Sequence, residues 1–210
     1  MRTSLAIFRD KRLFSIFVFG IASGFPWVMI GSVLSAWLKD ESLSRSAIGL
    51  FGAIFAVYSF NFLWAPLLDR IKPLVLGQRR GWIGQMQLLI IGCCVWMSTL
   101  DAQSSLYQIA LCGFIIALSS ATQDIAIDAF RIDTIAQHET DAMSAASSLA
   151  TAGWWTGYGG LGAIPFMVAD MPGWEWQQIY LLLAAIMAVC LMATLLVAKE
   201  PKVNRQAMLD

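Results

Sequence analysis

Two aspartates and an arginine stand inside an apolar stretch, in the segment SSATQDIAIDAFRID at residues 119–133. Placed on an α-helix at 100° per residue, Asp124, Asp128 and Arg131 fall on one face. Polar groups inside a membrane span face the protein interior or a water-filled cavity, so this face is predicted to point inward. Small residues continue the same face toward the other end of the segment, namely Gly113, Ala117 and Ser120.

The two carboxylates differ in depth, and therefore in the chemistry they can do. Asp128 lies near the predicted interface with water, within reach of Arg131 at i+3, which favours an interfacial ion pair or a contact with the cluster of Arg70, Arg79 and Arg80. Asp124 lies about 6 Å deeper at 1.5 Å per residue. Burial disfavours the charged form of a carboxylate, which suits an acid that binds and releases protons. The alternative is a packing lock, with Asp124 hydrogen-bonded to Gln123 or to a neighbouring helix.

The elements that must position these residues are long and almost uncharged. The 210-residue chain is 58% hydrophobic and only 13% charged, about half the roughly 25% of soluble domains. A bilayer core requires about 20 mostly apolar residues per helix. We therefore predict an all-α polytopic membrane protein with six transmembrane helices in residues 1–200 and a tail, or the start of a central loop, at 201–210. The helices are expected at about 13–38, 47–68, 82–100, 106–130, 143–169 and 179–198.

Basic residues are distributed unevenly between the predicted loops. With the loops assigned to alternating sides, twelve basic residues fall on one side, and only Lys39 and Arg45 fall on the other. Cytoplasmic loops collect Lys and Arg, so both termini are predicted to be cytoplasmic. The loops are too short for an extramembrane domain, and the function is therefore expected in or across the bilayer.

Polar and aromatic residues elsewhere are candidates for a substrate cavity. The fifth segment, SAASSLATAGWWTGYGGLGAIPF, combines Thr151 with Trp154 and Tyr158, two rings at i and i+4 on one face. Flat rings beside hydroxyl groups suit a sugar, whose C–H faces stack while its hydroxyls hydrogen-bond. Helix packing and an interfacial aromatic belt are the alternative. Asn61, an amide in an apolar setting, requires a partner and is a further candidate, with Ser120.

The first segment carries Gly20-x-x-x-Gly24, a spacing that permits close helix packing. Pro26 lacks a backbone N–H and leaves one carbonyl without its helical partner. Packing is the favoured role of the glycines. The alternative is a break at residues 24–27, which would turn backbone groups and Trp27 toward a cavity.

The turn FLWAPLLDRIKPLVLGQRRGW at residues 62–82 places charges at the membrane surface. Asp69, Arg70, Arg79 and Arg80, together with Arg131, are predicted to form a network whose pairing differs between two conformations. Plain topological signalling by basic residues is the alternative.

This turn resembles the loop between helices two and three of the major facilitator superfamily, with Ala65 where glycine is usual and six residues inserted before Gly77. The stretches FLWAPLLDR with GQRRGW, SSATQDIAIDAF and GIASGFPWVMIGSVLSAWL resemble the AmpG-type anhydromuropeptide permeases. The resemblance implies the N-terminal, 3+3 half-bundle of a proton-driven transporter. Its substrate would be GlcNAc-anhydro-MurNAc, with or without peptide, imported across the bacterial inner membrane for peptidoglycan recycling. Asp124, Gln123 and Asp128 would then serve transport and proton coupling.

Six helices are half of the twelve or more in that superfamily, so the expected partners include a second six-helix bundle, from another copy or a separate chain. The alternative function is a truncated, non-transporting scaffold or regulatory half-protein. An enzyme is not expected, because two acids four residues apart on one helix cannot flank a substrate. Metal-ligand spacing and nucleotide-binding motifs are not found, so no metal, cofactor or nucleic-acid partner is expected. The cysteines are expected to be small core residues, namely Cys93, Cys94, Cys112 and Cys190.

Overall fold

The computed structural model describes residues 10–71, 73, 76–135 and 139–197, and the elements assigned within these ranges are all helices. The predicted tail at 201–210 lies outside the described residues. In chain order the elements are α2 (Lys11–Val28), the π-helix η1 (Met29–Val33), α3 (Leu34–Asp40), α4 (Arg45–Phe51), the 3₁₀ helix η2 (Gly52–Phe55), α5 (Ala56–Ser59), the 3₁₀ helix η3 (Asn61–Leu63), α6 (Ala65–Arg70), α7 (Gln78–Met97), α8 (Leu106–Thr134), α9 (Thr140–Trp155), the π-helix η4 (Thr156–Gly160), the 3₁₀ helix η5 (Leu161–Ala163), α10 (Ile164–Ala169) and α11 (Trp176–Val197).

Each of the six predicted spans falls on one of these runs of helix. Four runs are long and apolar enough to cross a membrane: Lys11–Asp40, Arg45–Leu63, Leu106–Thr134 and Trp176–Val197. The other two, α7 and the run from α9 to α10, carry more glutamine, serine and glycine. The chain is therefore a helical, multi-pass membrane protein.

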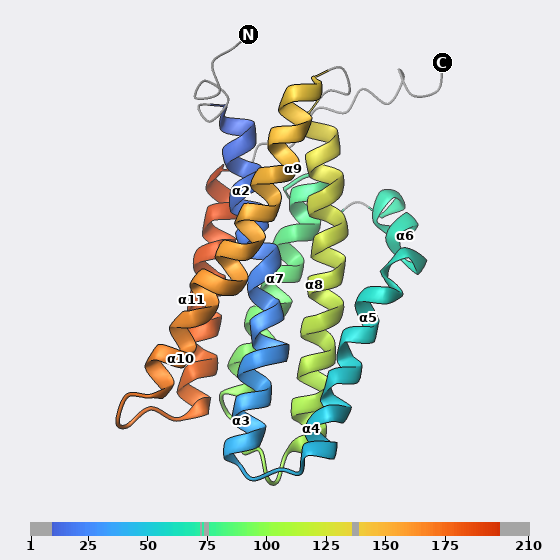
Figure 1. Cartoon of the computed structure of the whole chain (residues 1–210). Helices are drawn as coiled ribbons and strands as arrows, with labels where there is room; N and C mark the ends of the chain where they lie inside the picture. Colours follow the sequence, from blue (N-terminus) through green and yellow to red (C-terminus); the bar gives the residue numbers. More distant parts are fainter. Residues whose placement is uncertain (1–9, 72, 74–75, 136–138, 198–210) are drawn as a thin grey trace.

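Successive segments run antiparallel, so the chain reverses direction at each loop (Figure 1). The Ser15 hydroxyl donates to the carbonyl oxygen of Val197 over 3.3 Å, which places the start of α2 beside the end of α11. We call this end of the bundle the charged end. At the opposite end, Trp176 Nε1 donates to Asp40 Oδ2 over 3.0 Å, joining the start of α11 to the end of α3.

The crossing of α2 with α9 and η4 is the closest helix contact, and glycines make it possible. A Cβ atom added at Gly20 would lie only 3.0 Å from the Cα atom of Gly153, and one added at Gly153 would lie equally close to Gly20. A Cβ at Gly24 would overlap the carbonyl oxygen of Trp154. The predicted packing role of the first glycine pair is confirmed, and Gly153-x-x-x-Gly157 is its counterpart on the facing helix.

The segment Arg45–Arg70, which we call helix two, lies at one edge of the bundle beside α8 (Figure 1). It is broken into α4, η2, α5, η3 and α6, whereas the sequence predicted one span at 47–68. Pro66 lies in the first turn of α6, just after the break between η3 and α6. From α4 to η3 none of its side chains is fully buried. Its partly buried apolar side chains, among them Ile48, Phe51 and Ile54, pack against the main core.

The main hydrophobic core fills the space between α2, α7, α8 and α11. Its largest fully buried side chains include Phe25, Trp37 and Tyr180. The Tyr180 hydroxyl donates to the Met29 carbonyl oxygen over 3.0 Å, which anchors the π-helix η1 against α11. All four cysteines are buried and unbridged, as expected for small core residues.

Candidate functional site

Asp124 lies within the membrane-spanning helix α8, on the side that faces α2. It is ten residues from the end of α8 at Thr134, or about 15 Å along the helix axis. The Ser23 hydroxyl donates to Asp124 Oδ1 over 2.6 Å. The carboxylate is only partly buried. Among the described residues, Ser23 is thus the side-chain hydrogen-bond partner of this carboxylate.

The neighbouring Gln123 forms a different link between the same two helices. Pro26 cannot donate to the carbonyl oxygen of Ala22, four residues earlier. Gln123 Nε2 donates to that oxygen over 2.8 Å, and its side chain is fully buried. The alternative of a break at residues 24–27 is wrong, because α2 continues through Val28. Gln123 thus positions α8 against α2 beside Asp124. Asp124 is hydrogen-bonded to Ser23 of the neighbouring helix α2, which is one of the two contacts that the packing-lock alternative expects, and not to Gln123.

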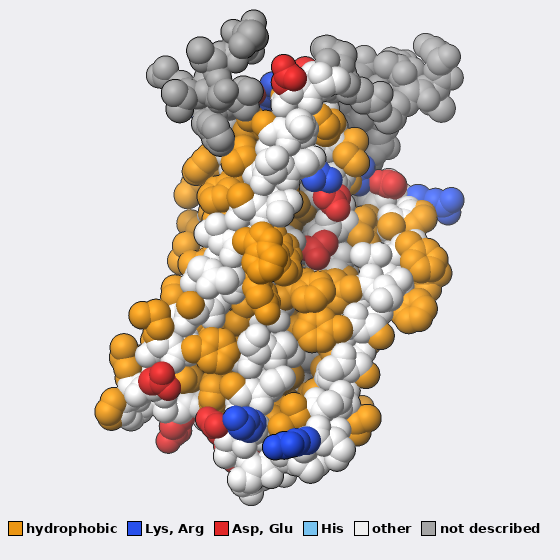
Figure 2. All heavy atoms as spheres, in the orientation of Figure 1, with side chains coloured by type: hydrophobic (Ala, Val, Ile, Leu, Met, Phe, Trp, Pro, Cys, Tyr) orange, Lys and Arg blue, Asp and Glu red, His pale blue; other side chains and the backbone are white. Residues whose placement is uncertain are grey.

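An aromatic cluster adjoins this carboxylate, one helical turn further from the charged end. Trp27 follows Ser23 by four residues, and its ring lies 5.9 Å from that of Trp154. Trp154 and Tyr158 are stacked, with centroids 5.1 Å apart and planes at 15°. The structure therefore brings together three of the predicted cavity residues, from α2, α9 and η4. Figure 2 shows hydrophobic side chains across the middle of the recess between α9 and helix two, with acidic side chains between them and the charged end.

Helix two contributes two residues to this cluster that the sequence analysis did not select. The rings of Phe55 and Tyr58 lie 5.0 Å and 4.5 Å from Trp27. Tyr58 also lies within electrostatic range of Ser120 and Asp124. A signal existed, since Phe51, Phe55 and Tyr58 follow helical spacing, but Asn61 is the cavity candidate that the sequence analysis selects on this segment.

Two predicted cavity residues are placed differently. Thr151 is exposed, and its hydroxyl donates back to the carbonyl oxygen of Ser147 over 3.1 Å. Asn61 begins η3 and is partly buried. Neither makes a ring contact or hydrogen bond with the aromatic cluster among the described residues.

The charged end carries the predicted network in part. Arg79 Nη1 donates to Asp69 Oδ1 over 2.6 Å and Arg79 Nε to Asp133 Oδ2 over 2.9 Å, so one guanidinium joins α6, α7 and α8. The expected pair of Arg131 with Asp128 is present at 3.0 Å. Arg131 therefore pairs with a residue of its own helix. The link from α8 to Arg79 is made by Asp133, which the predicted network did not include.

Other side chains at this end donate to the last carbonyl groups of neighbouring helices. Arg80 donates to the carbonyl oxygen of Leu195 in α11. Gln78 donates to the carbonyl oxygens of Leu68 and Asp69 at the end of α6. Arg70 ends α6 and is exposed. These contacts cap helices whose final carbonyls have no partner within the helix.

A second ionic cluster joins the starts of α2 and α9. Arg12 donates to Asp10 and, through Nη1 and Nη2, to both carboxylate oxygens of Glu139 over 3.0 Å. Arg12 Nη1 also lies 3.4 Å from the carbonyl oxygen of Thr134, the last residue of α8. The sequence analysis counted Arg12 only as a topological charge, because pairing across 127 positions leaves no local signal.

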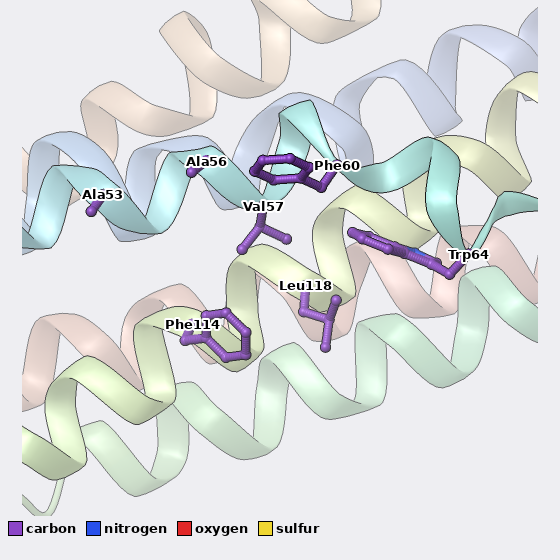
Figure 3. Close-up of a pocket in the computed structure, with 7 residues that line it drawn as sticks. All are labelled: Ala53, Ala56, Val57, Phe60, Trp64, Phe114 and Leu118. Carbon is purple, nitrogen blue, oxygen red and sulfur yellow. The ribbon is translucent and has the colours of Figure 1, made fainter.

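A groove on the other side of helix two has a different chemistry. It has a volume of about 320 Å³ and lies between helix two and α8, lined by Ala53, Ala56, Val57, Phe60, Trp64, Phe114 and Leu118 (Figure 3). The indole nitrogen of Trp64 is already engaged, donating to Thr122 Oγ1 over 3.0 Å. The other side chains that line this groove are apolar, so the groove suits a hydrocarbon chain. The recess beside Asp124 is therefore the candidate site for a polar substrate.

Comparisons with known proteins agree with this arrangement. The anhydromuropeptide permease of Escherichia coli K12 is 36% identical over 198 residues, which is 94% of this chain and 39% of that protein. The putative transporter AmpG 4 of Rickettsia felis is 35% identical over 186 residues, 87% of this chain and 44% of that protein. An uncharacterized protein of Haemophilus influenzae is 34% identical over 208 residues, 97% of this chain and 46% of that protein.

The chain thus spans less than half the length of these relatives. Its own sequence matches the profile of the Major Facilitator Superfamily over residues 14–209, nearly its whole length. The helical, antiparallel bundle and the acidic residue within it are consistent with that match. This chain belongs to the Major Facilitator Superfamily.

Proposed function

We propose that this chain is one six-helix half of a proton-driven transporter that imports anhydromuropeptides from the periplasm to the cytoplasm. One observation carries the proposal: a partly buried carboxylate, Asp124, lies within a membrane helix, bonded to Ser23 and one turn from an aromatic cluster. The substrate class is drawn from the E. coli relative, whose name is anhydromuropeptide permease.

Asp124 has the surroundings of a proton-binding residue. An ionised aspartate at the centre of a membrane helix costs about 2.5–3.5 kcal/mol on insertion scales. Protonation removes this cost, so proton binding and release can bias two conformations. The Ser23 hydroxyl donates to a carboxylate and can accept from a carboxylic acid, and the contact therefore persists in both states. Proton release toward the cytoplasm would return Asp124 to its ionised form.

The aromatic cluster and Ser120 have the chemistry of a sugar site. The rings of Trp27, Trp154 and Tyr158 offer flat apolar faces for sugar C–H groups. Ser120 is fully buried, and its hydroxyl has no hydrogen-bond partner among the described residues. A ligand hydroxyl or acetamido group would satisfy it.

The orientation follows from the charges. Arg12, Arg79, Arg80 and Arg131 all lie at the charged end, which we assign to the cytoplasm, with both termini there and the protein in the bacterial inner membrane. A second six-helix bundle, from another copy or a separate chain, would face the recess between helix two and α9. Rocking of the two bundles would then open the site to either side. The network around Arg79 would stabilise one of these states.

Uptake of labelled anhydromuropeptide into vesicles, with and without an uncoupler, tests the proposal. The chain should be assayed alone and with a co-expressed C-terminal half of an anhydromuropeptide permease. Absence of uptake under both conditions would refute the transport function of this chain.

Asp124→Asn tests the coupling role. Uptake by the variant should fall to the level that the unsubstituted protein shows with uncoupler, because the amide cannot release a proton. Asp170→Asn, at an exposed carboxylate after α10, is the control and should retain gradient-dependent uptake. Gradient-dependent uptake by Asp124→Asn at the normal level would remove Asp124 from proton coupling.

A further inference from the structure

Three buried polar atoms without a hydrogen-bond partner among the described residues gather at one place: Trp27 Nε1, the Tyr58 hydroxyl and the Ser120 hydroxyl. The rings of Trp27 and Tyr58 are 4.5 Å apart, and Tyr58 lies close to Ser120 and within electrostatic range of Asp124. The hydroxyl groups of Tyr58 and Ser120 lie close to each other, but their arrangement does not meet the geometric criteria of a hydrogen bond. Buried polar groups are nearly always partnered, so such a cluster indicates a place for a polar ligand or ordered water.

These atoms come from three separate parts of the fold. Trp27 is on α2, Ser120 is on α8, and Tyr58 is on α5 of helix two. From α4 to η3, helix two packs against the bundle through side chains that are only partly buried, among them Phe51, Ile54 and Phe55. A ligand that hydrogen-bonded to all three atoms would therefore add a link between this segment and the core.

We infer that the Tyr58 hydroxyl is a ligand-binding group, and that a sugar bound between Tyr58, Trp27 and Ser120 fastens helix two to the bundle. This inference rests on the proposed function and adds to it a residue of the binding site and a structural response. A sugar fits these atoms because its hydroxyl and acetamido groups both donate and accept. The rings of Trp27 and Tyr58 beside these atoms supply apolar surface for its C–H groups.

Tyr58→Phe isolates the hydroxyl, because the variant keeps the ring and its packing on Trp27. Tyr107→Phe is the matched control, since Tyr107 lies near the start of α8 at the opposite end and is 81% exposed. Purified anhydromuropeptide is titrated into each protein in lipid nanodiscs, with tryptophan fluorescence as the readout. Loss of one hydrogen bond predicts about tenfold weaker binding for Tyr58→Phe and unchanged binding for Tyr107→Phe.

Hydrogen exchange of the amides in residues 45–63 gives a second readout that affinity alone does not provide. Ligand at saturation should slow exchange of this segment in the unsubstituted protein and in Tyr107→Phe, but much less in Tyr58→Phe. Ser120→Ala, which removes the hydroxyl that α8 contributes to the proposed sugar site, should show the same loss of protection. These results together would support the inference.

The failures are distinguishable. Normal affinity and normal protection in Tyr58→Phe, with the ligand bound by the unsubstituted protein, would overturn the inference and leave the proposed function intact. Weaker binding with full protection of residues 45–63 would overturn the fastening of helix two. No binding by the unsubstituted protein would refute the proposed function, and this inference with it.

Discussion

The glycine contact between α2 and η4 makes a quantitative prediction for Gly157→Ala. A Cβ atom at Gly157 would overlap the carbonyl oxygen of Ile21 and lie 3.1 Å from its Cα atom, whereas ordinary contacts begin at 3.4 Å. Both neighbours are backbone atoms of a continuous helix, so a rotamer change cannot relieve the clash. The helices must separate by about 1 Å, and overpacking of this kind costs roughly 1–3 kcal/mol.

Gly159→Ala is the matched control, because Gly159 lies in the same π-helix and a Cβ added there meets nothing within 4 Å. Its expected effect is neutral or slightly stabilising, since alanine lowers the entropy of the unfolded chain. Reversible unfolding in mixed micelles measures both variants under the same conditions. We expect Gly157→Ala to be less stable by roughly 1–3 kcal/mol, at the upper end because the clash is with backbone. Equal stabilities would refute the close contact between α2 and η4.

Two further predictions concern the links around the site and at the charged end. Gln123→Leu should destabilise the fold by about 1–3 kcal/mol, because the carbonyl oxygen that Pro26 releases loses its donor. In a Pro26→Ala background that carbonyl regains a backbone N–H, so the cost should shrink, as a double-mutant cycle of unfolding free energies would show; an unchanged cost would exclude this link. Asp69→Asn, at a carboxylate that is 64% exposed, should change stability by less than about 1 kcal/mol. Asp133→Asn should cost distinctly more, since its side chain is only 15% exposed, and the ranking would be contradicted if both unfold alike at low and high salt.

Some of the site could be predicted because single-helix geometry determines it. The contact of Arg131 with Asp128 follows from i+3 spacing, and the stacking of Trp154 and Tyr158 follows from i+4 spacing. The 100° spacing also places Asp133 on the opposite side of α8 from Asp124, and Asp133 does pair with α7 while Asp124 contacts α2. In these cases the spacing of residues along one helix is enough to predict which side chains share a face.

The remaining contacts depend on how helices rotate and slide against each other, which one sequence does not determine. Ser23 meets Asp124 only because α2 crosses α8 at that height, and Glu139 meets Arg12 across most of the chain. Helical spacing groups Tyr58 with Phe51 and Phe55, but it does not show that Tyr58 meets Trp27 of α2. The interruptions of helix two and the π-helix η4 coincide with residues such as Gly52, Pro66 and Gly157, but the sequence does not show which glycines interrupt a helix, since Gly20 and Gly24 lie inside the continuous helix α2.

The capping contacts at the charged end have a consequence for experiments on topogenesis. Arg12 and Arg80 are among the basic residues from which the topology is predicted, and each also donates to a terminal carbonyl of another helix. A charge reversal designed to invert the chain in the bilayer would therefore also unravel helix ends in the native orientation. Loss of function in such a variant would therefore not show whether membrane insertion or folding had failed. Reporter fusions in the loops, which leave these guanidinium groups in place, separate the two effects.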